Sequence, residues 1–478
     1  MATYPIQQLF YDGKVQSATS GKTFKTIDPS TGNVLAEVQS ASESDVDAAI
    51  NAAQSAFCSW SQTSPSYRAR ILMKADELLR DRNNKIAEIE THDTGKPFSE
   101  TSTVDIVTGA EVLAFYANLV ASGGLNGETI SLRPDAWIYT KKEALGICVG
   151  IGAWNYPIQI ALWKSAPCLA AGNCMIYKPS EFTPLHGLIL AQIYSEAGLP
   201  AGVFNLVHGD KLVGSYLTTH PKIAKVSSLD KFRQVRKVPS SFYRMLILKS
   251  SGRSYDGQFF SSGQVCTNGT RVFVPRKLQS AFEKRLIEKM QYVRSLAPMD
   301  PNSNFGPLVS EIHHAKVLKY IEHGINVDKA RLIYGGTDRP SKIPVGYENG
   351  YWIRPTIFTD CTDSMKITQE EIFGPVLCIL PYDTIEEAII RANNTHLGLA
   401  AGVFGRDINM CHEVIGKLEA GITWINTWGE SPAEMSVGGW KMSGLGVENG
   451  KRGLSAWVRE RSTLVEGSGN VATVFSKL

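Results

Sequence analysis

Cys266 is the residue whose type and surroundings best suit nucleophilic chemistry. It follows a turn that contains Gly263, and its neighbours Ser261, Ser262 and Thr267 are small and polar. A thiolate in such a setting can attack a carbonyl carbon and form a covalent intermediate. A cysteine taken alone is more often an inert core residue, so its assignment depends on the stretches of chain around it.

The elements that would position this cysteine follow an α/β pattern. A buried strand at 146–152 ends in glycines, Pro157 starts a helix that runs to about Ala171, and 175–178 is the next strand. A further helix at 184–197 and a strand at 203–207 extend this βαβ unit, which predicts a doubly wound dinucleotide domain. Another Rossmann-like fold fits the spacing equally well, because the glycines do not match G-x-G-x-x-G.

Five separate stretches resemble signatures of the aldehyde dehydrogenase family and occur in the family's order. They are Ala153–Pro157, Lys178–Glu181, Phe259–Gly269, Glu370–Pro375 and Gly438–Gly444. The likeness spans most of the chain and is greatest to the bacterial NAD-dependent betaine aldehyde dehydrogenases. It implies an α/β, aldehyde dehydrogenase-like fold, with a Rossmann-type cofactor domain, an α/β catalytic domain and a β-rich oligomerisation arm.

The resemblance also implies domain boundaries. The NAD-binding domain would comprise residues 1–124 and 144–228, and the catalytic domain residues 229–446. The arm and C-terminal tail would comprise residues 125–143 and 447–478. Because this arm pairs subunits in the family, a homodimer or homotetramer is expected.

The same resemblance assigns roles in the reaction. Cys266 would capture an aldehyde as a thiohemiacetal, and the Asn155 amide with the backbone N–H of Cys266 would stabilise the oxyanion. Taken alone, Asn155 would more often be a helix N-cap. Oxidation then gives a thioester that water must cleave. Lys164 and Glu448 resemble residues with charge-relay roles in the betaine aldehyde branch.

NAD is the cofactor that the resemblance implies. Lys178 and Glu181 match the pair that holds the adenosine ribose, and a carboxylate there favours NAD over NADP because a 2′-phosphate would meet like charge. Glu371 matches the contact to the nicotinamide ribose, with Phe373 as its packing partner. The expected cofactor-binding residues are Gly152, Ala153, Trp154, Lys178, Pro179, Ser180, Glu181, Glu371 and Phe373.

Aromatic residues carry the expectation about the substrate. Tyr156 and Trp163 are seven residues apart, two helical turns, so they share a face. Trp428 lies in a stretch that closely resembles the betaine aldehyde branch. The attraction between an aromatic face and a quaternary ammonium group contributes about 0.5–2 kcal/mol per ring. These rings therefore predict that the enzyme oxidises betaine aldehyde to glycine betaine, an osmoprotectant made from choline. Core packing of these rings and an ω-aminoaldehyde substrate remain alternatives.

A potassium site is also expected from the resemblance alone. The residues that lie where the betaine aldehyde branch binds this ion are Thr26, Ile27, Asp93, Lys441 and Gly444. Backbone oxygens and a carboxylate are suitable hard ligands.

Between Ser227 and Phe259 the resemblance stops and then resumes. The family has there a glutamate that activates the deacylating water, whereas this chain is about twenty residues shorter and has no glutamate from Ala197 to Phe282. With suitable codons, another reading frame of this segment encodes what the family carries. We therefore hypothesise that segment 228–258 results from a frameshift with a deletion, which would leave a catalytically impaired remnant; a natural basic insert is the alternative.

Bulk composition excludes several other classes of protein. The formal net charge of +3 over 478 residues predicts no affinity for nucleic acid. The start has no signal-peptide pattern, and no apolar run approaches the roughly 18 residues of a membrane span. Eight scattered cysteines without a C-x-x-C pair suit a reducing cytoplasm. A cytoplasmic enzyme with a small aldehyde substrate is expected.

Overall fold

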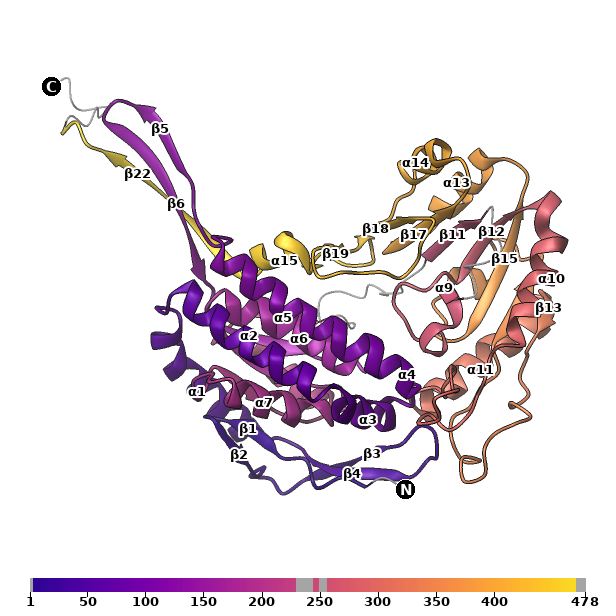
Figure 1. Cartoon of the computed structure of the whole chain (residues 1–478), viewed down its shortest axis with the longest axis horizontal. Coiled ribbons are helices and arrows are strands. Elements are labelled where there is room, and N and C mark those ends of the chain that lie inside the picture. The colour runs from indigo at the N-terminus through magenta and orange to yellow at the C-terminus, as the bar shows by residue number, and fades with distance from the viewer. Residues whose placement is uncertain (1–2, 229–243, 249–255, 470–478) are drawn as a thin grey trace.

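The computed structural model describes residues 3–228, 244–248 and 256–469. Two sheets with their helices form the body, and a long three-stranded arm extends from it (Figure 1). The α/β, aldehyde dehydrogenase-like fold expected from the sequence is confirmed. Of the divergent segment 228–258, only Ser228, the strand Arg244–Leu248 and residues 256–258 are described, so the frameshift hypothesis lies mostly outside the described residues.

The first sheet has six strands, and its first four are parallel. Their order is β10 (Ile223–Ser228), β7 (Ile147–Ile151), β8 (Cys174–Lys178), β9 (Phe204–Leu206), β1 (Leu9–Tyr11) and β2 (Lys14–Gln16). The last two form an antiparallel hairpin that joins at β9. The first four of the five residues of β7 are buried, as expected of a parallel strand that is covered on both faces.

Helices cover this sheet as its alternating pattern predicts. Those that contact its strands are α1 (Glu43–Trp60), α6 (Pro157–Ala170), α7 (His186–Glu196) and α8 (Lys211–Thr219). Helix α6 begins at Pro157, whose fixed φ suits the first turn of a helix. Strand β7, helix α6 and strand β8 therefore form the βαβ unit that the sequence predicted.

The expectation that no apolar run approaches the length of a membrane span is wrong. By length and composition alone, the 24-residue helical segment Phe98–Ala121 is long and apolar enough to cross a membrane. It consists of α4 (Phe98–Glu100), the π-turn η1 (Thr101–Asp105) and α5 (Ile106–Ala121). Helix α5 packs against α2 (Pro65–Asp81) and α6, so its apolar side belongs to the protein core.

The second sheet has seven strands and carries the stretch around Cys266. Their order is β13 (Arg331–Tyr334), β14 (Thr356–Thr359), β15 (Val376–Tyr382), β12 (Arg271–Pro275), β11 (Arg244–Leu248), β17 (Ala400–Phe404) and β18 (Ile422–Ile425). Every neighbouring pair is parallel except β13 with β14. The accompanying helices are α10 (Gln279–Met290), α11 (Glu311–Asn326), α13 (Ile385–Asn393) and α14 (Ile408–Ile415).

The arm consists of β5 (Thr129–Arg133), β6 (Ala136–Ala144) and β22 (Val458–Glu466). It projects from the body at the upper left of Figure 1. Several of its large apolar side chains are exposed, namely Ile130, Leu132, Trp137, Tyr139 and Leu464. The smaller elements near the site are the hairpin β3 (Thr23–Ile27) and β4 (Val34–Gln39), helix α3 (Asn83–Thr94) and strand β21 (Val447–Glu448).

Candidate active site

Cys266 lies in the loop between a short helical turn, Phe260–Gly263, and strand β12. Ser261 and Ser262 have φ values of 48° and 53°, in the left-handed region that residues with a Cβ seldom adopt. At Gly263, a Cβ would lie 2.2 Å from the backbone of Gly374, so only glycine permits this approach. The backbone three residues before Cys266 is therefore held against the stretch Glu370–Pro375, and the Cys266 thiol itself is half-buried.

A hydrogen bond joins this loop to the stretch Ala153–Pro157. The Asn155 side-chain amide donates to the carbonyl oxygen of Gln264 over 2.9 Å, and Asn155 is only 7% exposed. The Gln264 side chain in turn accepts from the backbone N–H of Val309 at 3.0 Å. Asn155 is thus bonded to the backbone of the residue two positions before Cys266.

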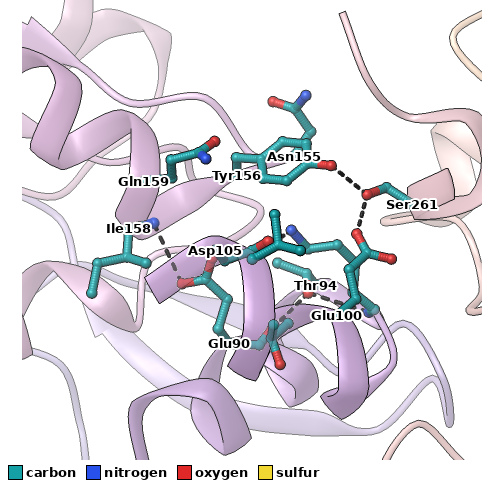
Figure 2. Close-up of polar contacts among 12 residues, drawn as sticks. Glu90, Thr94, Glu100, Asp105, Asn155, Tyr156, Ile158, Gln159 and Ser261 are labelled. Atoms are coloured by element: carbon teal, nitrogen blue, oxygen red, sulfur yellow. Dashed lines mark hydrogen bonds and ion pairs between the residues drawn. The ribbon is translucent and has the colours of Figure 1, made fainter. Parts of the chain in front are cut away.

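The three predicted substrate aromatics lie in different surroundings. Tyr156 is buried, packs with Val265, and forms a 2.6 Å hydrogen bond between its hydroxyl and that of Ser261 (Figure 2). Trp163 belongs to the large core of the first sheet, against which Cys266 and Trp428 also pack. Trp428 is half-buried, and its ring centroid lies 5.0 Å from that of Trp424.

Seven of the nine predicted cofactor residues lie at the ends of β7 and β8. The backbone N–H of Gly152 donates to the carbonyl of Lys178 at 2.8 Å, which ties the two strand ends together. Lys178 Nζ lies 3.6 Å from Glu181 Oε2, and it also donates to the Pro179 carbonyl. Ser180 follows directly and accepts from the backbone N–H of Phe182.

Trp154 and Phe373 meet although they are more than two hundred residues apart. Their rings form an edge-to-face pair with centroids 5.3 Å apart. Phe373 has a φ of 59°, and its carbonyl lies 2.8 Å from Nε2 of His313, whose ring is 5.1 Å from that of Trp154. Glu371 belongs to the same loop as Phe373. Sequence reasoning missed His313, because a single histidine in an amphipathic helix gives no signal.

Lys164 and Glu448 also come together, although 284 residues separate them. Lys164 Nζ lies 3.3 Å from Glu448 Oε1 and 3.1 Å from the Ser227 hydroxyl. Ser227 itself donates to Glu448 at 2.9 Å. The lysine is fully buried and is paired with both an anion and a hydroxyl, as a buried charge requires.

The chain matches the model of the aldehyde dehydrogenase family over residues 15–241 and 249–463. The chain belongs to the aldehyde dehydrogenase family. An aldehyde dehydrogenase of Bacillus cereus, solved as its NAD+ complex, is 35% identical with a TM-score of 0.89, and the match covers 96% of each chain. An aldehyde dehydrogenase of Pseudomonas aeruginosa is 30% identical with a TM-score of 0.90 over 96% of each chain.

A betaine aldehyde dehydrogenase point mutant from Staphylococcus aureus, also bound to NAD+, is similar to this aldehyde dehydrogenase to a comparable degree. It is 29% identical with a TM-score of 0.90, and the match covers 98% of this chain and 99% of that one. Since relatives with differing names match about equally well, these likenesses establish the family and leave the substrate open.

The residues expected to bind potassium lie in two separate places. Thr26 donates to Asp93 Oδ1 at 3.0 Å, and the backbone N–H of Leu185 donates to Asp93 Oδ2 at 2.9 Å. Burial raises the pKa of Asp93 to about 8, against the pull of those two donors. Ile27 follows Thr26 at the end of strand β3.

Lys441 and Gly444 make up the second of these places. The Lys441 ammonium donates to the carbonyls of Asn393 and Thr395 and pairs with Glu419. Among the described residues, no group of three or more His, Cys, Asp or Glu side chains could hold a metal ion. Potassium therefore gains no support from the described part of the enzyme.

Proposed function

We propose that this enzyme oxidises betaine aldehyde to glycine betaine with NAD, with Cys266 as the nucleophile. The observation that carries the catalytic part is the hydrogen bond between the Asn155 amide and the Gln264 carbonyl, 2.9 Å long, because it joins the oxyanion-donor stretch to the cysteine loop. Membership in the aldehyde dehydrogenase family and the NAD+ complexes of its relatives support the reaction class and the cofactor.

The chemistry proceeds at the Cys266 sulfur. The thiolate forms a bond to the aldehyde carbon, and the carbonyl π-electrons move to oxygen to give an oxyanion. The Asn155 amide still has one N–H beside the one that it gives to Gln264, and with the backbone N–H of Cys266 it stabilises that oxyanion. Bound NAD supplies the hydride acceptor. Water then adds to the resulting thioester, and the C–S bond breaks to release the acid and the thiolate.

The residues at the ends of β7 and β8 suit a dinucleotide. A carboxylate, Glu181, stands beside the Lys178 ammonium at the carboxyl end of a central parallel strand, which is where such sheets bind nucleotides. Glu181 has 42% of its side chain exposed, so the carboxylate can accept from a ribose diol. The remaining proposed contacts are Gly152, Ala153, Trp154, Pro179, Ser180, Glu371 and Phe373.

Support for a cationic substrate comes from the aromatic residues near the cysteine loop. Tyr156 packs on Val265, the residue before Cys266, and Trp428 packs against the same core as Cys266. Each ring over a desolvated trimethylammonium group contributes about 0.5–2 kcal/mol. Two rings therefore predict a preference for the cation of roughly fivefold or more in kcat/KM.

The test compares betaine aldehyde with 3,3-dimethylbutanal, its neutral isostere, by NADH absorbance. We expect kcat/KM to be higher for betaine aldehyde than for 3,3-dimethylbutanal. Trp428→Leu should reduce the ratio of these two kcat/KM values. Trp440→Leu, which changes an exposed tryptophan, should leave the ratio unchanged. Equal kcat/KM for both aldehydes would overturn betaine aldehyde as the substrate. A preference for ω-aminoaldehydes over betaine aldehyde would assign the enzyme to that alternative.

A second candidate function is that of an impaired remnant, and the missing glutamate favours it. General-base catalysis contributes about 10²–10⁴-fold, so an enzyme without that glutamate would acylate and then stall. Turnover at a rate equal to that of a relative with the intact segment would exclude this candidate. Sequencing the gene across codons 228–258 tests the frameshift hypothesis directly.

We also propose the domain boundaries that the sequence analysis gives. The arm, we further propose, pairs copies of this chain as a homodimer or homotetramer. The exposed apolar residues on β5, β6 and β22, Leu132 and Trp137 among them, support a partner at the arm. Light scattering of the full chain, compared with Leu132→Glu, tests this: the variant should have a smaller mass.

A further inference from the structure

A buried cluster of charged groups lies beneath the cysteine loop. Glu90 of α3, Lys96, Glu100 of α4 and Asp105 of η1 are all less than 8% exposed. The Lys96 ammonium pairs with Asp105 and lies 3.8 Å from the centre of the Tyr156 ring. None of these four residues has a part in the reaction described above, yet Figure 2 shows Asp105 near Tyr156 and Glu100 bonded to Ser261.

The charges in this cluster do not balance. One lysine faces three carboxyl groups, and burial opposes the ionised form of each of them. Burial, with Asp105 nearby, raises the pKa of Glu90 well above its usual range, and burial also raises the pKa of Asp105. Protons are therefore retained in the cluster at a pH where exposed carboxyl groups have lost theirs.

Glu100 is the member that reaches the cysteine loop. Its carboxylate accepts a hydrogen bond from the Ser261 hydroxyl, and that same hydroxyl is 2.6 Å from the hydroxyl of Tyr156. Burial raises the pKa of Glu100 to about 7, while Lys96 and the bond from Ser261 oppose that rise. Glu100 also lines a cavity of about 220 Å³ beside Phe260, through which it can exchange a proton with water.

The protonation of Glu100 sets the direction of this hydroxyl chain. The Ser261 hydroxyl has one proton to donate. When Glu100 is ionised, Ser261 must donate to it, and Tyr156 then donates to Ser261. When Glu100 is protonated, it can donate to Ser261, which then donates to Tyr156 and leaves the Tyr156 proton free to point elsewhere. Tyr156 adjoins Asn155, and Ser261 adopts the left-handed φ of 48° that leads the chain toward Cys266.

We propose that Glu100 is a positioning residue: through the Ser261 hydroxyl it fixes the turn before Cys266 and determines which way Tyr156 donates its proton. The inference rests on Cys266 being the nucleophile of the proposed function. The ionised and protonated states of Glu100 then correspond to two arrangements of the loop, so the reactivity of the Cys266 thiol depends on a carboxyl group that never touches the substrate.

The titratable and charged groups around Glu100 are few and identifiable. Lys96 and Asp105 act on it electrostatically, and Glu90 belongs to the same cluster from α3. Tyr156 faces it from the start of α6, and burial with Glu100 and Asp105 nearby raises the pKa of this phenol well above its usual range. Tyr156 is therefore neutral whenever Glu100 titrates, and its role is limited to hydrogen bonding.

The test follows alkylation of Cys266 by iodoacetamide from pH 5.5 to 9 in the full chain, with the labelled peptide quantified by mass spectrometry. The wild-type profile should contain an inflection near pH 7 in addition to that of the thiol. Glu100→Gln should lose it, because the amide cannot titrate, and the rate at pH 8 should change by about 2- to 10-fold. Glu111→Gln, a matched change of an exposed glutamate on α5, should retain the wild-type profile.

A second variant separates positioning from charge. Ser261→Ala keeps the Glu100 carboxyl group and removes its connection to the loop, so it should lose the same inflection. Retention of the inflection in Ser261→Ala would overturn the inference, since Glu100 would then act through its charge alone, and so would identical profiles for Glu100→Gln and Glu111→Gln. If Cys266 reacts no faster than the exposed Cys58 in the wild type, the proposed function fails instead.

Discussion

Lys164 Nζ lies 3.3 Å from Glu448 Oε1, although 284 residues separate them in the sequence. The Lys164 side chain is fully buried, and the Glu448 side chain is 13% exposed. This ion pair joins helix α6, which follows Asn155, to strand β21, which lies close to the base of the arm. It therefore connects helix α6 with the segment that precedes β22.

Replacing Lys164 with methionine tests how much this pair contributes to stability. Truncating one member of a buried pair leaves the other charge without its partner, which costs about 3–5 kcal/mol. We expect that loss in the free energy of unfolding measured with urea. Lys74→Met, which breaks an exposed pair with Glu77, should cost less than about 1 kcal/mol. Equal losses for the two variants would contradict the prediction.

Asn155→Ala tests whether Asn155 is the oxyanion donor that we propose. Removing one such donor typically reduces the rate of the chemical step by about 10²–10³-fold, so the single-turnover rate of NADH formation should fall by that factor. The affinity for NADH, measured by its fluorescence, should stay within about twofold because Asn155 lies at the cysteine loop. An unchanged single-turnover rate would remove Asn155 from the mechanism.

The absence of glutamate from Ala197 to Phe282 predicts a stalled acyl-enzyme. Mixing enzyme, NAD and aldehyde should release about one NADH per active site and then proceed roughly 10²–10⁴-fold more slowly. Hydroxylamine attacks thioesters without needing a general base, so adding it should accelerate the slow phase. A linear time course with no burst, unaffected by hydroxylamine, would show that deacylation is not limiting.

Local sequence patterns predicted the βαβ unit around Pro157 because the information lies within a few turns of chain. Strand 147–151 is an apolar run, strand 174–178 is apolar up to Lys178, and Pro157 marks the start of the helix between them. The meeting of Asn155 with Gln264, 109 residues away, has no such local signal. It could be expected only because the two stretches resemble motifs of one family.

The charged cluster beneath the loop could not be predicted from the sequence. Lys96, Glu100 and Asp105 follow one another in a short polar stretch, and such residues are usually solvated. The π-turn at Thr101–Asp105 adds a residue to the helical turn and so changes which side chains face inward. Only the tertiary structure reveals that three carboxyl groups share one lysine.

His313 is expected to position the cofactor contacts through Phe373. Its ring bonds to the Phe373 carbonyl and packs against Trp154. His313→Leu removes a partly buried hydrogen bond that contributes about 1 kcal/mol, so KM for NAD should rise about fivefold with little change in kcat. His313→Gln keeps a donor and should recover most of that loss, whereas His314→Leu, which breaks a contact to Trp352, should leave KM unchanged.

The acidity of His313 gives that prediction a further check. Burial lowers the pKa of His313 to about 4, so the ring stays neutral between pH 5.5 and 9. The pH dependence of KM for NAD should therefore contain no inflection caused by His313, and His313→Leu should show the same pH dependence as the wild type. An inflection that disappears in this variant would mean that the imidazole is charged in the working enzyme.

The raised pKa of Glu100 predicts how the stability of the enzyme changes with pH. Its folded-state pKa of about 7 lies above the ordinary value of 4.5, so the folded state holds the proton more tightly than the unfolded state does. That contribution is fully present below pH 4.5 and is lost as the pH rises through 7. The free energy of unfolding measured with urea should therefore be lower at pH 8 than at pH 5.5 by about 1–3 kcal/mol. Glu100→Gln should show a smaller difference between the two pH values than Glu111→Gln does. If the two variants show the same dependence, Glu100 is ionised in the folded enzyme at both pH values and the cluster holds its proton on another carboxyl group.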